Sequence, residues 1–208
     1  MTPKVTWHWG IPYEKSLAWQ IRERSNVYES SDPMSISLLL CEHPPTITIG
    51  KRGGTIHHQR MDTVVHQIKR GGLATWHGPG QLAFYPIVPL QSHRIGIKDY
   101  VCLLEQTIID GLQHYGVTGQ RQNTPGIWVG NKKIASIGVE VRAGVTNHGI
   151  AINVHPDLDR FADIIPCGDP NVIMTSLEYE SSEKVSILEL GQQCIKIFTK
   201  RYSKAIRT

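Results

Sequence analysis

Cys167 stands in a short segment whose neighbours favour a turn. Pro166 and Gly168 flank it, so neither a helix nor the interior of a strand is expected there. A thiol presented on a turn is well placed to attack a bulky substrate, but only the thiolate is a good nucleophile. A cation or a base must therefore lie near it. The other cysteines lie in apolar patterned segments, where cysteine is typically a small buried hydrophobe: Cys41, Cys102 and Cys194.

Lys133 is a candidate for that cation. It lies in residues 132–142, whose alternating pattern predicts a strand, and successive side chains of a strand point to opposite faces. Lys133 then shares a face with four apolar residues: Ala135, Ile137, Val139 and Val141. A lysine in register with an apolar face is uncommon unless it reaches water or has a partner. The pattern leaves both readings open, a frayed strand end in solvent and a lysine that approaches Cys167 across the fold.

A glycine-rich segment from Arg70 to Gln81 is the third feature that packing does not explain. It holds four glycines and one proline in twelve residues. Glycines permit close approach of a ligand to the backbone, whose amide N–H groups then line a narrow slot. His77, in the middle, can donate or accept a hydrogen bond. We favour this interpretation over a plain connection between strands, because the glycines flank a basic and an aromatic residue.

Part of the same segment matches a dinucleotide-binding pattern, and we reject that match. The pattern Gly-x-Gly-x-x-Ala, from Gly78 to Ala83, needs a helix directly after it. Residues 84–89 contain two prolines, which exclude a regular helix. The chain also lacks the Gly-x-x-x-x-Gly-Lys-Ser/Thr phosphate loop. We therefore expect no ATP and no other nucleotide cofactor.

The residues from His148 to Val154 predict an apolar strand with little bulk at Gly149 and Ala151. Small side chains there would leave room for a chain-like ligand. Close packing of the strand explains them equally well, so the pattern does not decide between the two.

The order of the predicted elements favours an α+β fold. Short runs predict strands at 5–9, 35–41, 46–49, 117–122, 126–129, 132–142 and 148–154. Helices are predicted at 12–24, where Tyr13, Leu17 and Ile21 share a face, at 97–115, and after Ser186, where Glu189 completes a capping box. Because the strands cluster without strict alternation with helices, we expect a mixed, mostly antiparallel sheet with packed helices.

Composition bounds the class of protein. The 208 residues, 40% hydrophobic and 19% charged, are typical of one globular domain spanning residues 1–208. There is no run of about 18 apolar residues and no secretory or transit signal, so we expect a cytoplasmic protein without a membrane span. Without a C-x-x-C pair no zinc site is expected, and without a secretory signal no disulfide framework is expected. The net charge of +4 is too small to indicate nucleic acid, but one basic cluster could meet an acidic partner: Lys51, Arg52, Arg60, Lys69 and Arg70.

Four blocks, taken in order, resemble the lipoyl(octanoyl) transferase family. They are Arg70-Gly-Gly-x-x-Thr75-x-His77-Gly-Pro-Gly-Gln81, Lys133-Ile-Ala-Ser-Ile-Gly138, His148-Gly-x-Ala-x-Asn153 and Pro166-Cys-Gly168, with Thr175-Ser176 after the last. The resemblance covers roughly residues 44–177. Agreement of four blocks in order and spacing makes it specific, as a lone Pro-Cys-Gly would not.

The resemblance implies a fold similar to the catalytic module of biotin and lipoate protein ligases. It implies transfer of an octanoyl group from octanoyl-acyl carrier protein to a lysine of a lipoyl domain, the first step of protein lipoylation. Cys167 would form a thioester intermediate, with Lys133 as its partner. The implied acceptors are apo lipoyl domains of 2-oxoacid dehydrogenase E2 subunits and the glycine cleavage H protein, and neither ATP nor a metal is implied.

The resemblance also assigns residues that bind the acyl group. They are Arg70, Gly71, Gly72, Leu73, Ala74, Thr75, Trp76, His77, Ser136, Ile137, Gly138, Gly149, Ile150 and Ala151. His148 and Gly168 are expected to support the site.

Three other functions fit part of the sequence. An ATP-dependent lipoate or biotin protein ligase of similar fold would bind an acyl-adenylate and would not need Cys167. A cysteine hydrolase would use Cys167 with His77 or His148 as its base and would release free acid. A non-catalytic module would bind lipoyl domains or acyl carriers without forming an acyl-enzyme. The missing phosphate loop is in keeping with the transferase, because thioester exchange followed by amide formation needs no ATP.

Overall fold

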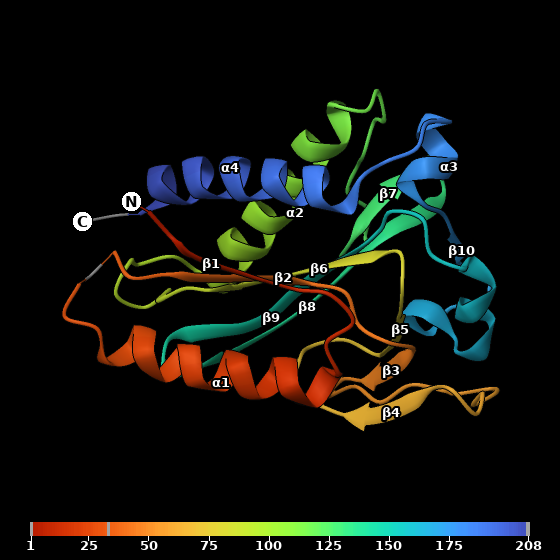
Figure 1. Ribbon diagram of the computed structural model, residues 1–208, viewed down its shortest axis with the longest axis horizontal. Coiled ribbons are helices and arrows are strands. Elements are labelled where there is room, and N and C mark those ends of the chain that lie inside the picture. The colour runs from red at the N-terminus through yellow and green to blue at the C-terminus, as the bar shows by residue number, and fades with distance from the viewer. Residues whose placement is uncertain (1, 33, 207–208) are drawn as a thin grey trace.

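A large mixed sheet lies between helices in the computed structural model, which describes residues 2–32 and 34–206. Within those residues the large sheet has seven strands in the order β1-β2-β6-β9-β8-β10, with β7 paired to β8. A smaller sheet has the order β4-β3-β5. Helix α1 covers one face of the large sheet, and α2 and α4 pack together on the other (Figure 1). This is the mixed α+β arrangement that the sequence predicted.

The elements have the following bounds along the chain. The strands are β1 (Lys4–His8), β2 (Ser37–Cys41), β3 (Thr46–Ile49), β4 (Val64–Gln67), β5 (Ala74–His77), β6 (Gln81–Ile87), β7 (Ile127–Val129), β8 (Lys132–Arg142), β9 (Val145–Asn153) and β10 (Ile173–Met174). The α-helices are α1 (Tyr13–Glu29), α2 (Ile97–Gln113), α3 (Leu177–Ser181) and α4 (Ile187–Ala205). Two short 3₁₀ segments, η1 (Leu158–Asp163) and η2 (Pro166–Gly168), lie between β9 and β10.

Strand β6 shows why the sheet is buried on both faces. Its side chains alternate: Leu82 and Phe84 belong to the core under α2 and α4, whereas Ala83 and Tyr85 pack in the core with Trp19 of α1. It pairs antiparallel with β2 on one side and with β9 on the other. β6 therefore holds two hydrophobic cores together.

Helix α4 begins where the sequence predicts. The Ser186 hydroxyl accepts a hydrogen bond from the Glu189 N–H, as an N-cap residue does. Residues four apart then form the buried stripe: Leu190, Cys194, Phe198 and Tyr202. This regular stripe explains why the helix was predictable from its pattern.

The middle of the glycine-rich segment forms a strand, β5, rather than a loop. β5 pairs antiparallel with β3, and the turn at Gly78–Gly80 leads directly into β6. Gly80 has φ +85°, and a Cβ there would lie 2.6 Å from the backbone of His155. A strand, not a helix, follows this turn, which confirms the rejection of the dinucleotide-binding pattern.

Two predictions about single elements were wrong. Residues 117–122 form no strand, because only Gln120 finds a partner, in an isolated bridge to Trp128. Cys102, expected to be buried, is exposed on α2. The predicted helix at 12–24 is present as α1, but Ile21 is 45% exposed and the helix buries Glu23, whose carboxylate accepts hydrogen bonds from Lys4 and Ser37.

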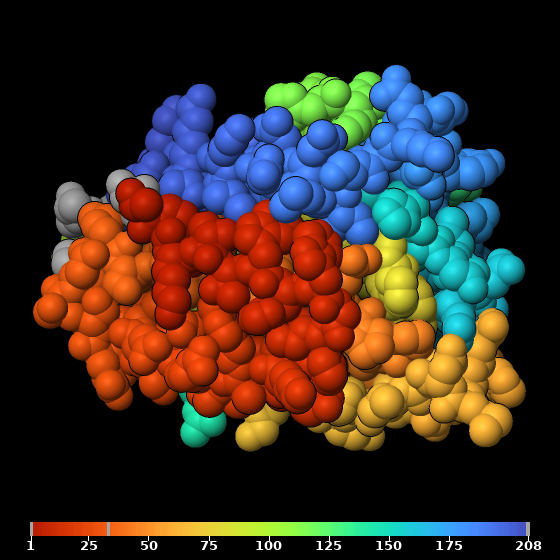
Figure 2. Space-filling model, in the orientation of Figure 1, coloured from red at the N-terminus to blue at the C-terminus, as the bar shows by residue number. Residues whose placement is uncertain are grey.

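The first part of the chain, coloured red, covers the middle of the face shown in Figure 2, below α4 and beside the smaller sheet. β1 pairs in parallel with β2 there and ends the large sheet. Among the described helices, none combines the length and the apolar character needed to cross a membrane.

Candidate active site

The side chains of Lys133 and Cys167 meet. Lys133 Nζ lies 2.8 Å from Cys167 Sγ and 3.1 Å from the carbonyl oxygen of Pro125. Lys133 is only 3% exposed, so the alternative of a frayed strand end in water is wrong. The ammonium also lies 5.6 Å from the centre of the Trp128 ring. A thiol and a buried amine, 34 residues apart in sequence, therefore form a close pair.

A β-bulge turns Lys133 toward the thiol. Ile127 of β7 pairs with Ala135 of β8, but the next residue, Trp128, pairs with Lys133, so one extra residue of β8 bulges at Ile134. Ala135 packs in the core under α2 and α4, whereas Lys133 lines the cavity described below. The prediction that Lys133 shares a face with Ala135 was wrong, because strict alternation does not continue through a bulge.

Cys167 sits in a strained turn. Its φ and ψ are 59° and 8°, the left-handed region that non-glycine residues rarely adopt, and Gly168 follows with φ +75°. The Gly168 N–H donates to the Ile165 carbonyl, and the Ile165 N–H donates to Thr55. Such strain persists only when the surroundings enforce it, and it is common where a nucleophile must be presented.

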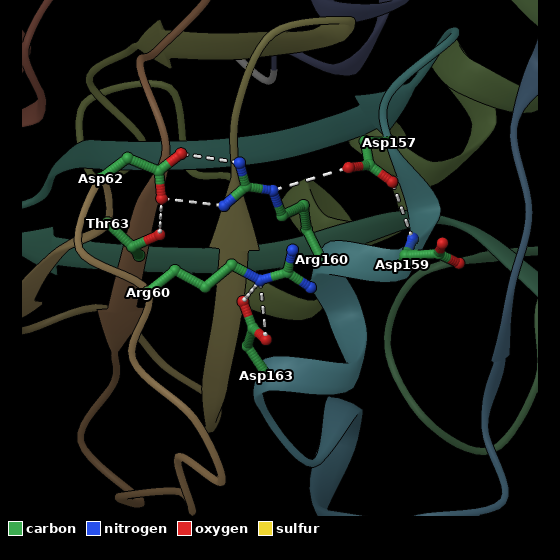
Figure 3. Close-up of polar contacts among 7 residues, drawn as sticks. All are labelled: Arg60, Asp62, Thr63, Asp157, Asp159, Arg160 and Asp163. Atoms are coloured by element: carbon green, nitrogen blue, oxygen red, sulfur yellow. Dashed lines mark hydrogen bonds and ion pairs between the residues drawn. The ribbon is translucent and has the colours of Figure 1, made fainter.

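Two ion pairs hold the segment before Cys167 in place (Figure 3). Arg60 donates to both carboxylate oxygens of Asp163, at 2.9 and 3.2 Å, and the Asp163 side chain is only 4% exposed. Arg160 of η1 pairs with Asp62 at 2.6 Å. Since Asp163 ends η1 four residues before Cys167, these pairs tie the turn of Cys167 to the loop at 55–63.

A cavity of about 330 Å³ opens beside the Lys133–Cys167 pair, and both residues line it. Thirteen of the fourteen predicted acyl-binding residues also line it: Arg70, Gly71, Gly72, Leu73, Ala74, Thr75, His77, Ser136, Ile137, Gly138, Gly149, Ile150 and Ala151. Ser136 and Gly138 of β8 pair with Ala151 and Gly149 of β9, so small residues from both strands lie together beneath it. The cavity supports the interpretation that small residues leave room for a chain-like ligand.

Trp76 and Gly168 do not line the cavity. Trp76 is 1% exposed and packs edge-on against Phe161, with ring centres 5.5 Å apart. Its neighbours Thr75 and His77 do line the cavity, and alternation along β5 sends the intervening side chain the other way. Trp76 therefore lies outside the cavity, unlike the other predicted acyl-binding residues.

His148 and Tyr13 form a polar wall of the cavity. Tyr13 Oη lies 3.2 Å from His148 Nδ1, and the His148 N–H donates to the Gln20 side chain at 2.8 Å. Burial, with Arg70 nearby, lowers the pKa of His148 to about 3. Burial and the neighbouring His43 also hold the pKa of His77 well below its usual value. Both cavity histidines are therefore neutral near pH 7.

No histidine of residues 2–32 and 34–206 is hydrogen-bonded to Cys167. His77 instead contacts Thr48 and Gln81, and the group on the thiol is Lys133. This arrangement disfavours a cysteine hydrolase with a Cys–His pair.

Arg70 is a buried part of the cavity wall rather than a surface cation. Its guanidinium donates to the carbonyl and hydroxyl of Thr48 and to the Gly71 carbonyl. A Cβ on Gly138 would lie 2.7 Å from its side chain, so only glycine fits beneath it. Arg60 is likewise engaged with Asp163, and the predicted basic cluster is reduced to three exposed members: Lys51, Arg52 and Lys69.

The sequence analysis missed several cavity residues: Tyr13, Arg52, Tyr85, Val101, Asn123, Thr124, Pro125 and Val139. All eight lie outside the four blocks, and most of them are on α1, α2 and β6 or in the loop before β7. The run Asn123-Thr-Pro-Gly126 signals a turn, but nothing in it signals contact with Lys133. In the described part of the chain, no group of three or more His, Cys, Asp or Glu side chains could hold a metal ion.

Known proteins resemble this chain in sequence and in fold. The lipoyl protein ligase A/B catalytic domain family matches residues 12–199. An octanoyltransferase of Magnetococcus marinus is 43% identical over 168 residues, which cover 80% of this chain and 79% of that protein.

Two solved structures share the architecture at low identity. A bi-partite lipoate protein ligase from Thermoplasma acidophilum, described with its E2 lipoyl domain, matches with a TM-score of 0.77 at 18% identity, over 98% of this chain and 84% of that one. A biotin protein ligase from Aquifex aeolicus, in complex with biotin and ATP, matches with a TM-score of 0.57 at 11% identity, over 97% and 71%. The predicted likeness to the catalytic folds of biotin and lipoate ligases is confirmed.

Proposed function

The chain belongs to the lipoyl(octanoyl) transferase family of acyltransferases, and on that premise we propose that it moves octanoyl from octanoyl-acyl carrier protein to a lysine of a lipoyl domain. The observation that carries the proposal is the contact of 2.8 Å between Lys133 Nζ and Cys167 Sγ at the cavity. A cation at that distance favours a thiolate, which is the nucleophilic form of cysteine. We assign Cys167 as the nucleophile and Lys133 as its proton-transfer partner.

The first half-reaction forms a thioester on the enzyme. The Cys167 thiolate attacks the carbonyl carbon of the donor thioester, and the bond from that carbon to the carrier's sulfur breaks. The departing carrier thiolate takes a proton from the Lys133 ammonium and leaves as a thiol. Lys133 is then a neutral amine next to an S-octanoyl Cys167.

The second half-reaction restores both residues. The neutral amine of the acceptor lysine attacks the S-octanoyl carbon, and the bond to Cys167 Sγ breaks. Lys133 takes the proton that the attacking nitrogen loses, so the Cys167 thiolate and the Lys133 ammonium are regenerated. One thioester is exchanged for another and then converted to an amide, and no ATP or metal ion enters the balance.

The acceptor class is proposed from relatives. The similar ligase from Thermoplasma acidophilum is described together with its E2 lipoyl domain, and a transferase of the same fold can use the same kind of domain. We propose the apo lipoyl domains of 2-oxoacid dehydrogenase E2 subunits and the glycine cleavage H protein as acceptors, and the cytoplasm as the place of reaction. Residues 1–208 would act as one catalytic domain.

The test is transfer to a purified apo lipoyl domain, followed by intact mass. With octanoyl-acyl carrier protein and no ATP, we expect the domain to gain one octanoyl group, and Cys167→Ala to abolish this gain. Lys133→Ala should slow transfer by about 10²- to 10⁴-fold, the range for a positioned proton-transfer group. Lys132→Ala is the matched control, because Lys132 pairs with Glu180 rather than with the thiol.

Other products would replace the proposal by one of its alternatives. Product formed from free octanoate only with ATP would indicate a ligase, and release of free octanoate would indicate a hydrolase. Binding of both proteins without any product would indicate a non-catalytic module.

A further inference from the structure

The loop at 121–126 forms the side of the cavity next to the catalytic pair. Asn123, Thr124 and Pro125 line the cavity, and the Pro125 carbonyl accepts a hydrogen bond from Lys133 Nζ at 3.1 Å. An ammonium has three protons to donate. Of these, one points to Cys167 and another to this loop, so the position of the loop helps to set the position of the amine.

One carboxylate holds both ends of this loop. Glu105 of α2 accepts from Arg121 Nε at 2.8 Å with one oxygen and from the Gly126 N–H at 3.4 Å with the other. Arg121 also donates to the Cys102 carbonyl and the Gln106 side chain of α2. Because Arg121 and Gly126 bracket the three cavity residues, Glu105 pins the loop to the helix on either side of Pro125.

Loss of the Glu105 carboxylate would disturb the surroundings of Lys133. Glu105 is only 6% exposed and forms an ion pair with Arg121. Gly126 lies directly against the catalytic amine, since a Cβ there would be 2.6 Å from Lys133 Cε and 3.1 Å from Nζ. A shift of the loop at Gly126 is therefore transmitted to Lys133 by contact.

We propose that Glu105 is a positioning residue: through Arg121 and Gly126 it holds the Pro125 carbonyl where it fixes Lys133 Nζ on the Cys167 thiol. The inference rests on the proposed function of the Lys133–Cys167 pair. Glu105 touches neither the acyl group nor the reacting sulfur, so its effect passes through the loop. Without it, Gly126 loses its bond to α2 and Arg121 keeps only those to Cys102 and Gln106, so the loop can shift and carry the Pro125 carbonyl away from Lys133.

A purely structural role for Glu105 predicts a different result. If the carboxylate only fastens α2 to the loop, its removal lowers the melting temperature but leaves the chemistry of Cys167 as it was. The rate and pH profile of Cys167 alkylation separate the two roles, because they report on the thiolate and not on global stability.

The experiment measures iodoacetamide alkylation of Cys167 in the full chain, by peptide mass, from pH 5.5 to 9.5. A Cys102→Ser background removes the exposed competing thiol. We expect Glu105→Ala to slow alkylation at pH 7 about tenfold or more, as for loss of a hydrogen bond to a charged group, and to move the profile to higher pH. Glu105→Gln, which keeps an acceptor for Gly126 but loses the charge opposite Arg121, should fall between Glu105→Ala and the parent protein.

Two controls make the outcomes distinct. Asp110→Asn removes a carboxylate of the same helix that pairs with Arg201. Asp110 reaches the loop only through Gln106, and asparagine keeps an oxygen that can accept from Gln106, so this variant should leave alkylation unchanged. Lys133→Ala should slow alkylation at least as much as Glu105→Ala.

The outcomes separate the two proposals. If Cys167 in Lys133→Ala is alkylated at the parent rate, the proposed function of the pair fails. If Lys133→Ala is slow but Glu105→Ala keeps the parent rate and profile, only the role of Glu105 is overturned. Should Glu105→Ala not fold, Glu105→Gln carries the test, and a parent rate in that variant overturns the role.

Discussion

Three buried neutral histidines make the stability of this protein sensitive to mild acid. His43, His77 and His148 surround Tyr13: the rings of His43 and His77 are centred 5.2 and 6.0 Å from its ring, and His148 is hydrogen-bonded to its hydroxyl. Burial lowers the pKa of His43 to about 4, that of His148 to about 3 and that of His77 well below 6.5. The pKa in the folded chain lies below the unfolded value for each of them.

The sign and size of the effect follow from proton linkage. As the pH falls below about 6.5, the unfolded chain binds protons at these three sites and the folded chain does not, so the stabilisation present above pH 6.5 is lost towards pH 4. One pH unit below the unfolded pKa, a site that stays neutral in the folded chain costs about 1.4 kcal/mol. At pH 5.5 His43 and His148 together therefore remove about 3 kcal/mol from a free energy of unfolding that is typically 5–15 kcal/mol, and His77 acts in the same direction.

Urea unfolding followed by tryptophan fluorescence at pH 7.5, 6.5 and 5.5 measures this loss. His148→Gln should reduce the drop between pH 7.5 and 5.5 by about 1.4 kcal/mol, because one proton-binding site is removed from the unfolded chain. His114→Gln, at an exposed position, should leave the drop unchanged. A free energy of unfolding that stays constant within about 0.5 kcal/mol from pH 7.5 to 5.5 would refute the linkage reasoning.

Two further predictions concern the loop at 55–63 and the mouth of the cavity. Asp163→Asn should lower the free energy of unfolding by about 3 kcal/mol in urea titrations, because it leaves Arg60 without its buried partner. Asp62→Asn, at an exposed pair, should change the free energy of unfolding little. Equal effects of the two variants would contradict this ranking. The exposed Arg52 lines the cavity, and we expect it to attract an acidic donor. Arg52→Glu should therefore raise KM for octanoyl-acyl carrier protein several-fold at low salt and hardly at all at high salt. A KM equal to that of the parent at low salt would contradict this role of Arg52.

The turn at Cys167 was predictable because its signal is local. Pro166 and Gly168 favour a turn whatever the rest of the chain does, and the structure places Cys167 on such a turn. Gly149 and Ala151 were visible as small residues, but the pattern left open whether they make room for a ligand or pack closely, and only the structure places them on the cavity. Helix α4 was predictable from local signals too, because its N-cap residue and its buried apolar residues all lie within one segment of the chain.

The contact between Lys133 and Cys167 could not be derived from pattern alone. It depends on the bulge at Ile134, which arises from how β7 pairs with β8 and leaves no mark in the alternation of β8 itself. Treating the glycine-rich segment as one loop likewise hid the strand β5, whose alternation turns Trp76 away from the cavity. Pro125 reaches the site through an anchor on another helix, Glu105, and such a long-range tie has no local signature.

The central claim is that Cys167 carries the octanoyl group, and the mass of the intact protein tests it most directly. Incubation with octanoyl-acyl carrier protein alone, without an acceptor, should add one octanoyl group to the parent protein and none to Cys167→Ala, and hydroxylamine should remove it as it does a thioester. Subsequent addition of an apo lipoyl domain should discharge the adduct onto the domain. An unmodified parent protein that still acylates the domain, or a Cys167→Ala variant that transfers at the parent rate, would contradict the account.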